Sequence, residues 1–300
     1  MRLVRILAVP LILAAAAYAW YPPFRLFTLV MAGRSPVCPL VNAVTVRSHV
    51  DEVNRVKDRI LEGSKLVREE AGLELWDTPK GPFWIPKGNR FVLPFNLAEM
   101  ELKIYGSGKH FIHPGDIVLD CGASDGDFTR EALAAGASKV IAIEIAPSSA
   151  ECIRRNLAAE ITAGKVQVYT KGVWDKDDTL TLNVDDTNFA ANSVVLRPAS
   201  SRPSIQVPLT TIDKIVAELG LPRVDFIKMD IEGAEVNAIR GARETLARFR
   251  PRMAITAEHQ PNDEFDIPAA VRQARPDYKI KCGPCLEEPE RIRADILYFY

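Results

Sequence analysis

The sequence Asp116-Ile-Val-Leu-Asp120-Cys-Gly122-Ala-Ser-Asp-Gly126-Asp-Phe128 predicts a buried strand, a sharp turn and the first turn of a helix. Its two glycines let the backbone turn without a Cβ and let a ligand lie against the main chain. The helix that follows offers free N–H groups at its start. The stretch therefore predicts a nucleotide-type pocket at the carboxyl end of a parallel strand.

The glycine spacing in this turn decides between two kinds of nucleotide. A dinucleotide fingerprint would read Gly-x-Gly-x-x-Gly, whereas Ser124 stands at the second glycine position and Asp127 at the third. A pyrophosphate would therefore lack its close-approach glycine. Asp120, which ends the strand, would repel a diphosphate and attract a cation. These residues favour a ligand with a positive charge and no phosphate.

The next strand supplies a second acid. Lys139-Val-Ile-Ala-Ile-Glu144 also ends in a carboxylate, which is well placed to accept hydrogen bonds from both hydroxyls of a ribose. A ligand with a ribose, a positive charge and no phosphate fits S-adenosylmethionine. We therefore expect Asp120 and Glu144 to bind this cofactor, and the alternative is a plain strand–turn–helix without a ligand.

A second stretch, Ile227-Lys-Met-Asp230-Ile-Glu-Gly-Ala-Glu235, repeats this design. The strand ends in charge, and an acid stands in the first turn of the next helix, where the helix dipole favours it. Asp230 should lie beside Asp120 if the two strands are neighbours. Lys228 shares a face with Asp230, and a lysine in a central strand needs a carboxylate partner. The alternative role for Glu235 is that of a capping acid.

The candidate catalytic groups also lie at this edge. His259 follows the predicted strand Met253–Glu258 and could take the proton of an attacking hydroxyl. Asp230 and Glu232 are the next candidates for this role, and Lys228 would order the carboxylates. A surface-loop position is the alternative for His259. We predict no metal site, and the alternative is a divalent cation at Asp230 and Glu232.

From residue 116 onward the predicted strands alternate with helices, which implies an α/β fold with a doubly wound, mostly parallel sheet. Between residues 178 and 208 apolar and polar residues alternate instead, which predicts a small β insertion on one edge of the sheet. Ser148 is the expected N-cap of a helix over 148–159. A single helix is expected over 234–249.

The chain before this domain has two further parts. Helical spacing of apolar residues over 50–72 predicts a solvated amphipathic helix, and the prolines and glycines of 77–94 predict an irregular cover. The predicted organisation is a hydrophobic N-terminal segment (1–35), a helical and irregular cover (36–94) and the catalytic domain (95–300).

Composition excludes some classes of protein. The chain has 300 residues, a formal net charge of −1 and 47% hydrophobic residues, which is ordinary for a globular protein. A nucleic-acid-binding protein usually shows a basic face, so we expect no nucleic-acid partner.

The five cysteines are odd in number and scattered, which does not fit a secreted disulfide framework. Cys282-Gly-Pro-Cys285 has the spacing of a redox dithiol, but a strand-like end follows it instead of a helix. The Gly-Pro pair favours a hairpin turn. His110 and His113 are expected to be loop residues, because no second ligand cluster lies near them in the sequence.

The N-terminus is apolar. Arg2 and Arg5 precede the uncharged run 6–21, which ends in Trp20 and Tyr21, residues that favour a membrane interface. The run is shorter than the ~20 residues of a spanning helix. A cleaved signal peptide, a membrane anchor or interfacial helix, and an ordinary packing helix are the alternatives. Because S-adenosylmethionine is a cytosolic metabolite, we expect an anchor with a cytoplasmic catalytic domain.

Four motifs together resemble the FkbM family of S-adenosylmethionine-dependent methyltransferases. They are Val118-Leu-Asp-Cys-Gly-Ala-Ser-Asp-Gly-Asp-Phe128, Val140-Ile-Ala-Ile-Glu144, Val207-Pro-Leu-Thr-Thr-Ile-Asp213 and Phe226-Ile-Lys-Met-Asp-Ile-Glu-Gly-Ala-Glu235. The resemblance covers roughly residues 95–300. It implies a class I methyltransferase fold, a seven-stranded sheet with one antiparallel strand.

The resemblance also implies where the cofactor binds. The expected cofactor-binding residues are Asp120, Gly122, Ala123, Ser124, Gly126, Glu144, Gly172, Val173 and Asp230. Glu144 would hold the ribose hydroxyls, and Gly172 and Val173 would lie near the adenine. The sequence departs from the family pattern at Cys121 and Ile145, and neither change removes a polar contact.

The family is associated with O-methylation of hydroxyls on sugars, polyketides and related metabolites, so the expected acceptor is a small-molecule or glycan hydroxyl. Two other classes remain open: an NAD or nucleotide-sugar enzyme on a similar sheet, and a membrane-tethered binding protein without activity. The missing glycines and Asp120 argue against the first.

Overall fold

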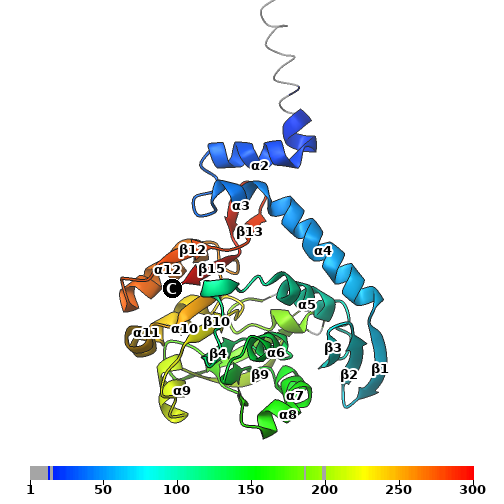
Figure 1. Cartoon of the computed structure of the whole chain (residues 1–300), viewed down its shortest axis with the longest axis vertical. Coiled ribbons are helices and arrows are strands. Elements are labelled where there is room, and N and C mark those ends of the chain that lie inside the picture. Colours follow the sequence, from blue (N-terminus) through cyan, green and yellow to red (C-terminus); the bar gives the residue numbers. More distant parts are fainter. Residues whose placement is uncertain (1–12, 14–15, 186, 198–200) are drawn as a thin grey trace, which may run out of the picture.

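The computed structural model describes residue 13 and residues 16–185, 187–197 and 201–300 (Figure 1), and side chains are described outside 201–204. Residues 6–12, 14 and 15 of the apolar N-terminal run, with Arg2 and Arg5 before it, lie outside these ranges.

A seven-stranded sheet forms the centre of the molecule. Its strands, in spatial order, are β12 (Ile280–Cys282), β15 (Ile296–Phe299), β11 (Arg252–Thr256), β10 (Phe226–Met229), β4 (Ile117–Cys121), β5 (Lys139–Ile143) and β6 (Val166–Tyr169). β15 runs antiparallel to both of its neighbours, and the other pairs are parallel. The seven strands with one antiparallel member confirm the predicted sheet.

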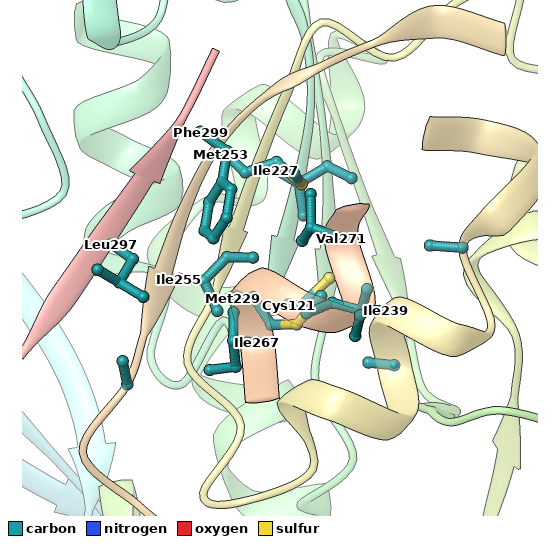
Figure 2. Packing of buried hydrophobic residues seen from close by; sticks show 14 of the residues in the cluster. Cys121, Ile227, Met229, Ile239, Met253, Ile255, Ile267, Val271, Leu297 and Phe299 are labelled. Carbon is teal, nitrogen blue, oxygen red and sulfur yellow. The ribbon is translucent and has the colours of Figure 1, made fainter. Parts of the chain in front are cut away.

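Apolar side chains cover both faces of this sheet. On one face, Figure 2 shows Met229 and Ile255 of the central strands packed near Ile239 of α10 (Glu235–Arg240) and Ile267 of α12 (Asp263–Ala274). The opposite face carries Phe226, which packs with Phe128 of α6 (Asp127–Ala134). The central strands are therefore buried on both sides, as the apolar runs in the sequence predict.

Helices connect the strands. They are α6 (Asp127–Ala134), α7 (Pro147–Asn156), α8 (Ala158–Thr162), α9 (Ile212–Glu218), α10 (Glu235–Arg240), α11 (Arg243–Phe249) and α12 (Asp263–Ala274). Two of the observed helices differ from their predictions in where they begin or end. The one over 148–159 begins at Pro147 with Ala146 as N-cap, because proline suits the first helical position. The one over 234–249 breaks at Gly241, where a Cβ would lie 2.0 Å from the Trp174 carbonyl oxygen.

The predicted β insertion is present as a separate sheet. It consists of β7 (Gly172–Val173), β9 (Ser201–Thr210) and β8 (Asp178–Asp185), in that order. A 3₁₀ turn, η2 (Phe189–Ala191), lies in the connection between β8 and β9. Phe189 packs against the N-terminal cover, so the insertion and the cover meet over the edge of the main sheet.

The N-terminal cover differs from its prediction. Residues 36–94 form α3 (Leu40–Val44), α4 (Val46–Glu62), β1 (Lys65–Glu70), β2 (Leu73–Thr78), β3 (Gly81–Pro86) and the start of α5 (Val92–Leu102). The helix α2 (Pro22–Met31) precedes the cover, and the 3₁₀ turn η1 (Gly108–His110) follows it. The helix predicted to residue 72 ends at Glu62, and the segment predicted to be irregular contains a strand. β1 is fully exposed, so its charged sequence carries no apolar alternation, and antiparallel pairing with β2 holds it.

The described part of the expected membrane segment packs on the domain. Leu26 and Leu29 of α2 are buried in the main apolar cluster, whereas Trp20 and Met31 are 86% and 71% exposed. Among the helices of the described ranges, none combines the length and the apolar character that crossing a bilayer requires.

The segment Cys282-Gly-Pro-Cys285 also differs from its prediction. It joins β12 of the main sheet to β13 (Cys285–Glu287), which pairs with β14 (Ile292–Ala294) in a separate two-stranded sheet. The expected hairpin turn is therefore a crossing between two sheets. A disulfide joins Cys285 to Cys38, 247 residues away in sequence, a pairing that cysteine spacing does not reveal.

Candidate active site at the carboxyl edge of the sheet

The turns after β4 and β10 touch at the centre of the site. A Cβ on Gly122 would lie 1.9 Å from the main-chain oxygen of Asp230, and Gly122 has a φ of +80°. Only glycine satisfies both constraints. The neighbouring strands place Lys228 directly opposite Asp120, which confirms that the two predicted motifs lie side by side.

Glu144, at the end of β5, borders the same turn. Its Oε2 accepts a hydrogen bond from the Ser124 N–H at 2.8 Å, and its Oε1 accepts one from the Ala146 N–H at 2.7 Å. Burial raises the pKa of Glu144 to about 7, although these N–H groups oppose the rise. Each carboxylate oxygen keeps a second lone pair for a ligand hydroxyl.

A narrow cavity of about 110 Å³ opens between these turns. Eight of the predicted site residues line it: Gly122, Ser124, Glu144, Gly172, Val173, Lys228, Asp230 and Glu232. The Ser124 hydroxyl is buried without a hydrogen-bond partner. With Glu99 and Asp127, which also line it, five carboxyl groups and an apolar wall surround a space that has an unused polar group at its edge.

Three other predicted cofactor residues lie behind this lining. Asp120 is fully buried, and its Oδ2 accepts a hydrogen bond from the Thr129 hydroxyl at 2.6 Å. Ala123 belongs to the apolar cluster around Ile153. Gly126, with a φ of +89°, is the residue before α6. These three residues support the turn after β4 from the side away from the cavity. Their contact with a cofactor stays a prediction.

Lys228 is the buried cation of the site. Its Nζ donates to the Gly122 carbonyl at 2.8 Å and lies 3.7 Å from Asp120 and 3.9 Å from Asp230. Burial would lower the pKa of Lys228, but the carboxylates outweigh it and raise the pKa. The expected carboxylate partner of this lysine is therefore present, and the charged ammonium ties the two motifs together.

Asp230 is held in its ionised form. Its Oδ2 accepts a hydrogen bond from the Tyr105 hydroxyl at 2.6 Å. Burial opposes ionisation, but Lys228, His259 and the Tyr105 hydroxyl outweigh it, so the pKa of Asp230 lies below its usual range. A carboxylate is thus available beside the cavity at neutral pH.

His259 faces a cluster of acids. Its Nδ1 lies 2.9 Å from Oε1 of Glu235, which also accepts the Ile231 N–H at 2.9 Å. Its Nε2 lies 3.6 Å from Asp230 and 3.5 Å from Glu232. Burial would lower the pKa of His259, but Glu235, Glu232 and Asp230 raise it well above its usual value. Glu235 therefore holds the turn before α10 through the Ile231 N–H, outside the helix and its N-cap Ala234, and also orients the imidazole.

Backbone strain marks the same place. Glu232 has a φ of +54°, which is rare for a residue with a Cβ and clusters at functional sites. The ligand atoms of Asp230, Glu232 and His259 all lie within 4.8 Å of one another, so these three side chains are close enough to share one divalent cation.

A second, wider cavity of about 730 Å³ adjoins the first. Both are lined by Asp230, Glu232, Tyr105 and Glu99. The wider cavity extends under the N-terminal cover, and its wall includes the exposed ring of Phe95. The acids and His259 therefore stand where two cavities of different size meet.

Sequence reasoning missed several residues of this junction. Tyr105 and Glu99 come from α5 and the loop after it, and Asp127, which lines the narrow cavity, was noted only as a missing glycine. Burial raises the pKa of Asp127 to about 6. Nothing in the local pattern around Tyr105 signals its contact with Asp230, 125 residues away.

Comparison with known proteins agrees with this geometry. The family model of the methyltransferase FkbM domain matches residues 120–284. The 2-O-methyltransferase NoeI of Sinorhizobium fredii is 24% identical over 152 residues, covering 46% of this chain and 61% of that protein. The AMB antimetabolite synthetase AmbE of Pseudomonas aeruginosa is 24% identical over 268 residues, covering 74% of this chain and 12% of that protein. The chain thus spans less than two thirds of either relative.

Solved structures give a weaker likeness. A methyltransferase FkbM from Methylobacillus flagellatus KT superposes with a TM-score of 0.49 at 20% identity, covering 86% of this chain and 60% of that one. Fibrillarin from Aeropyrum pernix, solved with natively bound S-adenosyl-L-methionine, gives a TM-score of 0.39 at 14% identity, covering 79% of this chain and 98% of that one.

Proposed function

This chain belongs to the FkbM methyltransferase family, and from that premise we propose that it transfers the methyl group of S-adenosylmethionine to a hydroxyl of a sugar, glycan or related metabolite. The observation that carries the proposal is the meeting of a narrow acidic cavity and a wide cavity at Asp230. Methyl transfer needs two ligands held in line, so proximity supplies much of the rate.

The lining of the narrow cavity suits the cofactor in charge and polarity. Glu144 has lone pairs left for the two ribose hydroxyls, and Asp127 and Asp230 supply negative charge for a sulfonium. Gly172 leaves no room for a side chain, because a Cβ there would meet Leu209 at 2.5 Å. The apolar wall beside it suits an adenine. When bound, S-adenosylmethionine supplies an electrophilic methyl group.

The wide cavity suits a polyhydroxylated acceptor. Its wall combines the exposed ring of Phe95 with the carboxyl groups of Asp58, Glu258 and Asp295. Carboxyl oxygens accept hydrogen bonds from hydroxyls. The name of the 2-O-methyltransferase NoeI, a relative at 24% identity, also supports an oxygen acceptor.

The residues at the junction would remove the acceptor proton. We assign this role to the neutral imidazole of His259, whose Nε2 faces Asp230 and Glu232 while Glu235 holds Nδ1. Because its pKa is raised, the imidazole is mostly protonated at neutral pH, and its base form grows as the pH rises. Asp230, which is ionised, orients the hydroxyl, and Lys228 fixes Asp230.

The decisive experiment supplies S-adenosylmethionine with a labelled methyl group to the full chain and a panel of hydroxylated acceptors. The proposal expects a labelled methyl ether on one acceptor class and no transfer by His259→Ala. A chain that binds the cofactor and labels no acceptor would support a binding protein instead. A change in nicotinamide absorbance when NAD is added with the same acceptors, without methyl transfer, would favour a dehydrogenase.

The N-terminal segment is proposed to bind a membrane surface and to keep the catalytic domain at its cytoplasmic side. Support comes from Trp20, Tyr21, Phe27 and Met31, which are all exposed around α2, a composition that suits the interface. Vesicle co-sedimentation of the full chain should fall with Trp20→Glu and stay unchanged with Phe265→Glu, an exposed aromatic on α12. Equal loss in both variants, or in neither, would contradict this role.

A further inference from the structure

Three cysteines from distant parts of the chain converge outside the active site. Cys38 follows α2, Cys282 ends β12 and Cys285 begins β13, and all three are buried. Cys38 and Cys285 form the disulfide. The sulfur of the third residue, Cys282, lies 3.8 Å from that of Cys38 and 3.5 Å from that of Cys285. A free thiol therefore touches both sulfurs of the bond.

These distances match the geometry of a metal site. In tetrahedral zinc sites the Zn–S distance is about 2.3 Å, which places neighbouring sulfurs roughly 3.8 Å apart. Both contacts of Cys282 are close to this value. The third edge of the triangle is the disulfide itself. Its reduction would allow Cys38 and Cys285 to separate to the same spacing.

We propose that the reduced chain binds one thiophilic divalent cation, such as Zn²⁺, through the thiolates of Cys38, Cys282 and Cys285. A cellular dithiol gives two electrons and two protons to the Cys38–Cys285 bond and becomes a disulfide. Binding of the cation then displaces three protons from the three thiols. Reducing compartments keep thiols in this form.

The fourth ligand position faces a cavity. A space of about 300 Å³ is lined by Cys282 and Cys285 together with His49 and His110. A water from this cavity completes a tetrahedral set.

The site would hold residues 22–47, called here the N-terminal arm, on the two-stranded sheet of β13 and β14. Other contacts already join the two: Arg25 and Arg47 both pair with Glu287. The Asn42 side chain donates to the Gly283 carbonyl at 2.6 Å. A disulfide under oxidising conditions and a metal–thiolate site under reducing conditions would give the same cross-link, so the arm would stay docked in either state.

The test measures metal in the full chain, purified with excess dithiol reductant and zinc and then freed of unbound metal. Elemental analysis should find about one zinc per chain, and Co²⁺ in its place should give near-ultraviolet sulfur-to-cobalt absorption. Cys282→Ser should lose both signals, although it leaves the disulfide pair intact. Cys152→Ser, which removes a buried thiol elsewhere, should keep both.

Two results would overturn the proposal. One is a reduced wild-type chain that unfolds cooperatively in circular dichroism yet carries no zinc. The other is equal zinc in the wild type and in Cys282→Ser. The readout needs no methyl transfer, so failure here would leave the proposed function untouched, and failure of the methyltransferase assay would leave the metal site untouched.

Discussion

The two cavities that meet at Asp230 are built in different ways. The tips of β4, β5 and β10 give the narrow one a floor of glycine turns and carboxylates, and α5 and the insertion supply the rest of its lining. The wide one is roofed by α4, α5 and the insertion, which approach from far along the chain. Local motifs determine the floor of the narrow cavity, whereas long-range packing determines the wide cavity. The cofactor is therefore easier to infer from sequence than the acceptor.

The largest expected effect is on the turn that closes the narrow cavity. Gly122→Ala places a Cβ against the Asp230 carbonyl, so we expect a loss of about 3 kcal/mol or more in the free energy of unfolding and no cofactor binding. The control is Gly164→Ala, where φ is also positive but no atom lies within 4 Å. Gly164→Ala should lower the free energy of unfolding by roughly 1–2 kcal/mol. Denaturant unfolding of both variants makes the comparison, and equal losses would contradict it.

A substitution at the junction of the two cavities should lower the rate of methyl transfer without changing the affinity for the cofactor. His259→Gln removes the proposed base, so kcat should fall by about 10²–10⁴-fold while the Kd for S-adenosylhomocysteine stays within about twofold of the wild type. Stopped-time methyl transfer and calorimetry measure the two quantities. A variant with full kcat would move the role of base to Asp230.

The pH profile should separate these two bases. The pKa of His259 is raised, so the protonated form dominates at neutral pH and kcat should rise with pH until the imidazole has lost its proton. Glu235→Gln removes one negative charge beside Nδ1, which lowers that pKa, and should shift the rising limb to lower pH by about one unit. A flat profile across the neutral range would indicate that ionised Asp230 takes the proton.

The smallest effect belongs to the rim of the wide cavity. Asp58→Asn or Phe95→Ala should raise the KM for the acceptor by about tenfold, one lost contact of roughly 1.4 kcal/mol, without changing the Kd of the cofactor. The two cavities would then be separable by mutation. A parallel loss of cofactor affinity would show that the roof also shapes the narrow cavity.

Much of the narrow cavity follows from sequence because its physics is local. The strand before Gly122, the acid at Glu144 and the pairing of Lys228 with carboxylates are dictated by period-two burial, turn geometry and the cost of a buried charge. The position of Asp120 behind the cavity lining could not be predicted from the sequence. The sequence pattern indicates on which face of the sheet a side chain lies, but not how deeply it is buried.

The cover and the arm were predicted poorly for a related reason. β1 is exposed throughout, so its strand state depends on its partner and leaves no pattern in the chain. Tyr105 belongs to the site only because the fold brings its hydroxyl to Asp230, and its surroundings in the sequence do not indicate this contact. The disulfide between Cys38 and Cys285 joins segments 247 residues apart, and no spacing rule connects them.

The central claim is that the narrow cavity binds S-adenosylmethionine. Calorimetric titration of S-adenosylmethionine and S-adenosylhomocysteine into the full chain tests it most directly, with Glu144→Ala and Asp120→Ala as variants. The account predicts micromolar binding of both ligands to the wild type and its loss in both variants. Absence of binding by a wild-type chain that unfolds cooperatively, or wild-type affinity in both variants, would contradict it.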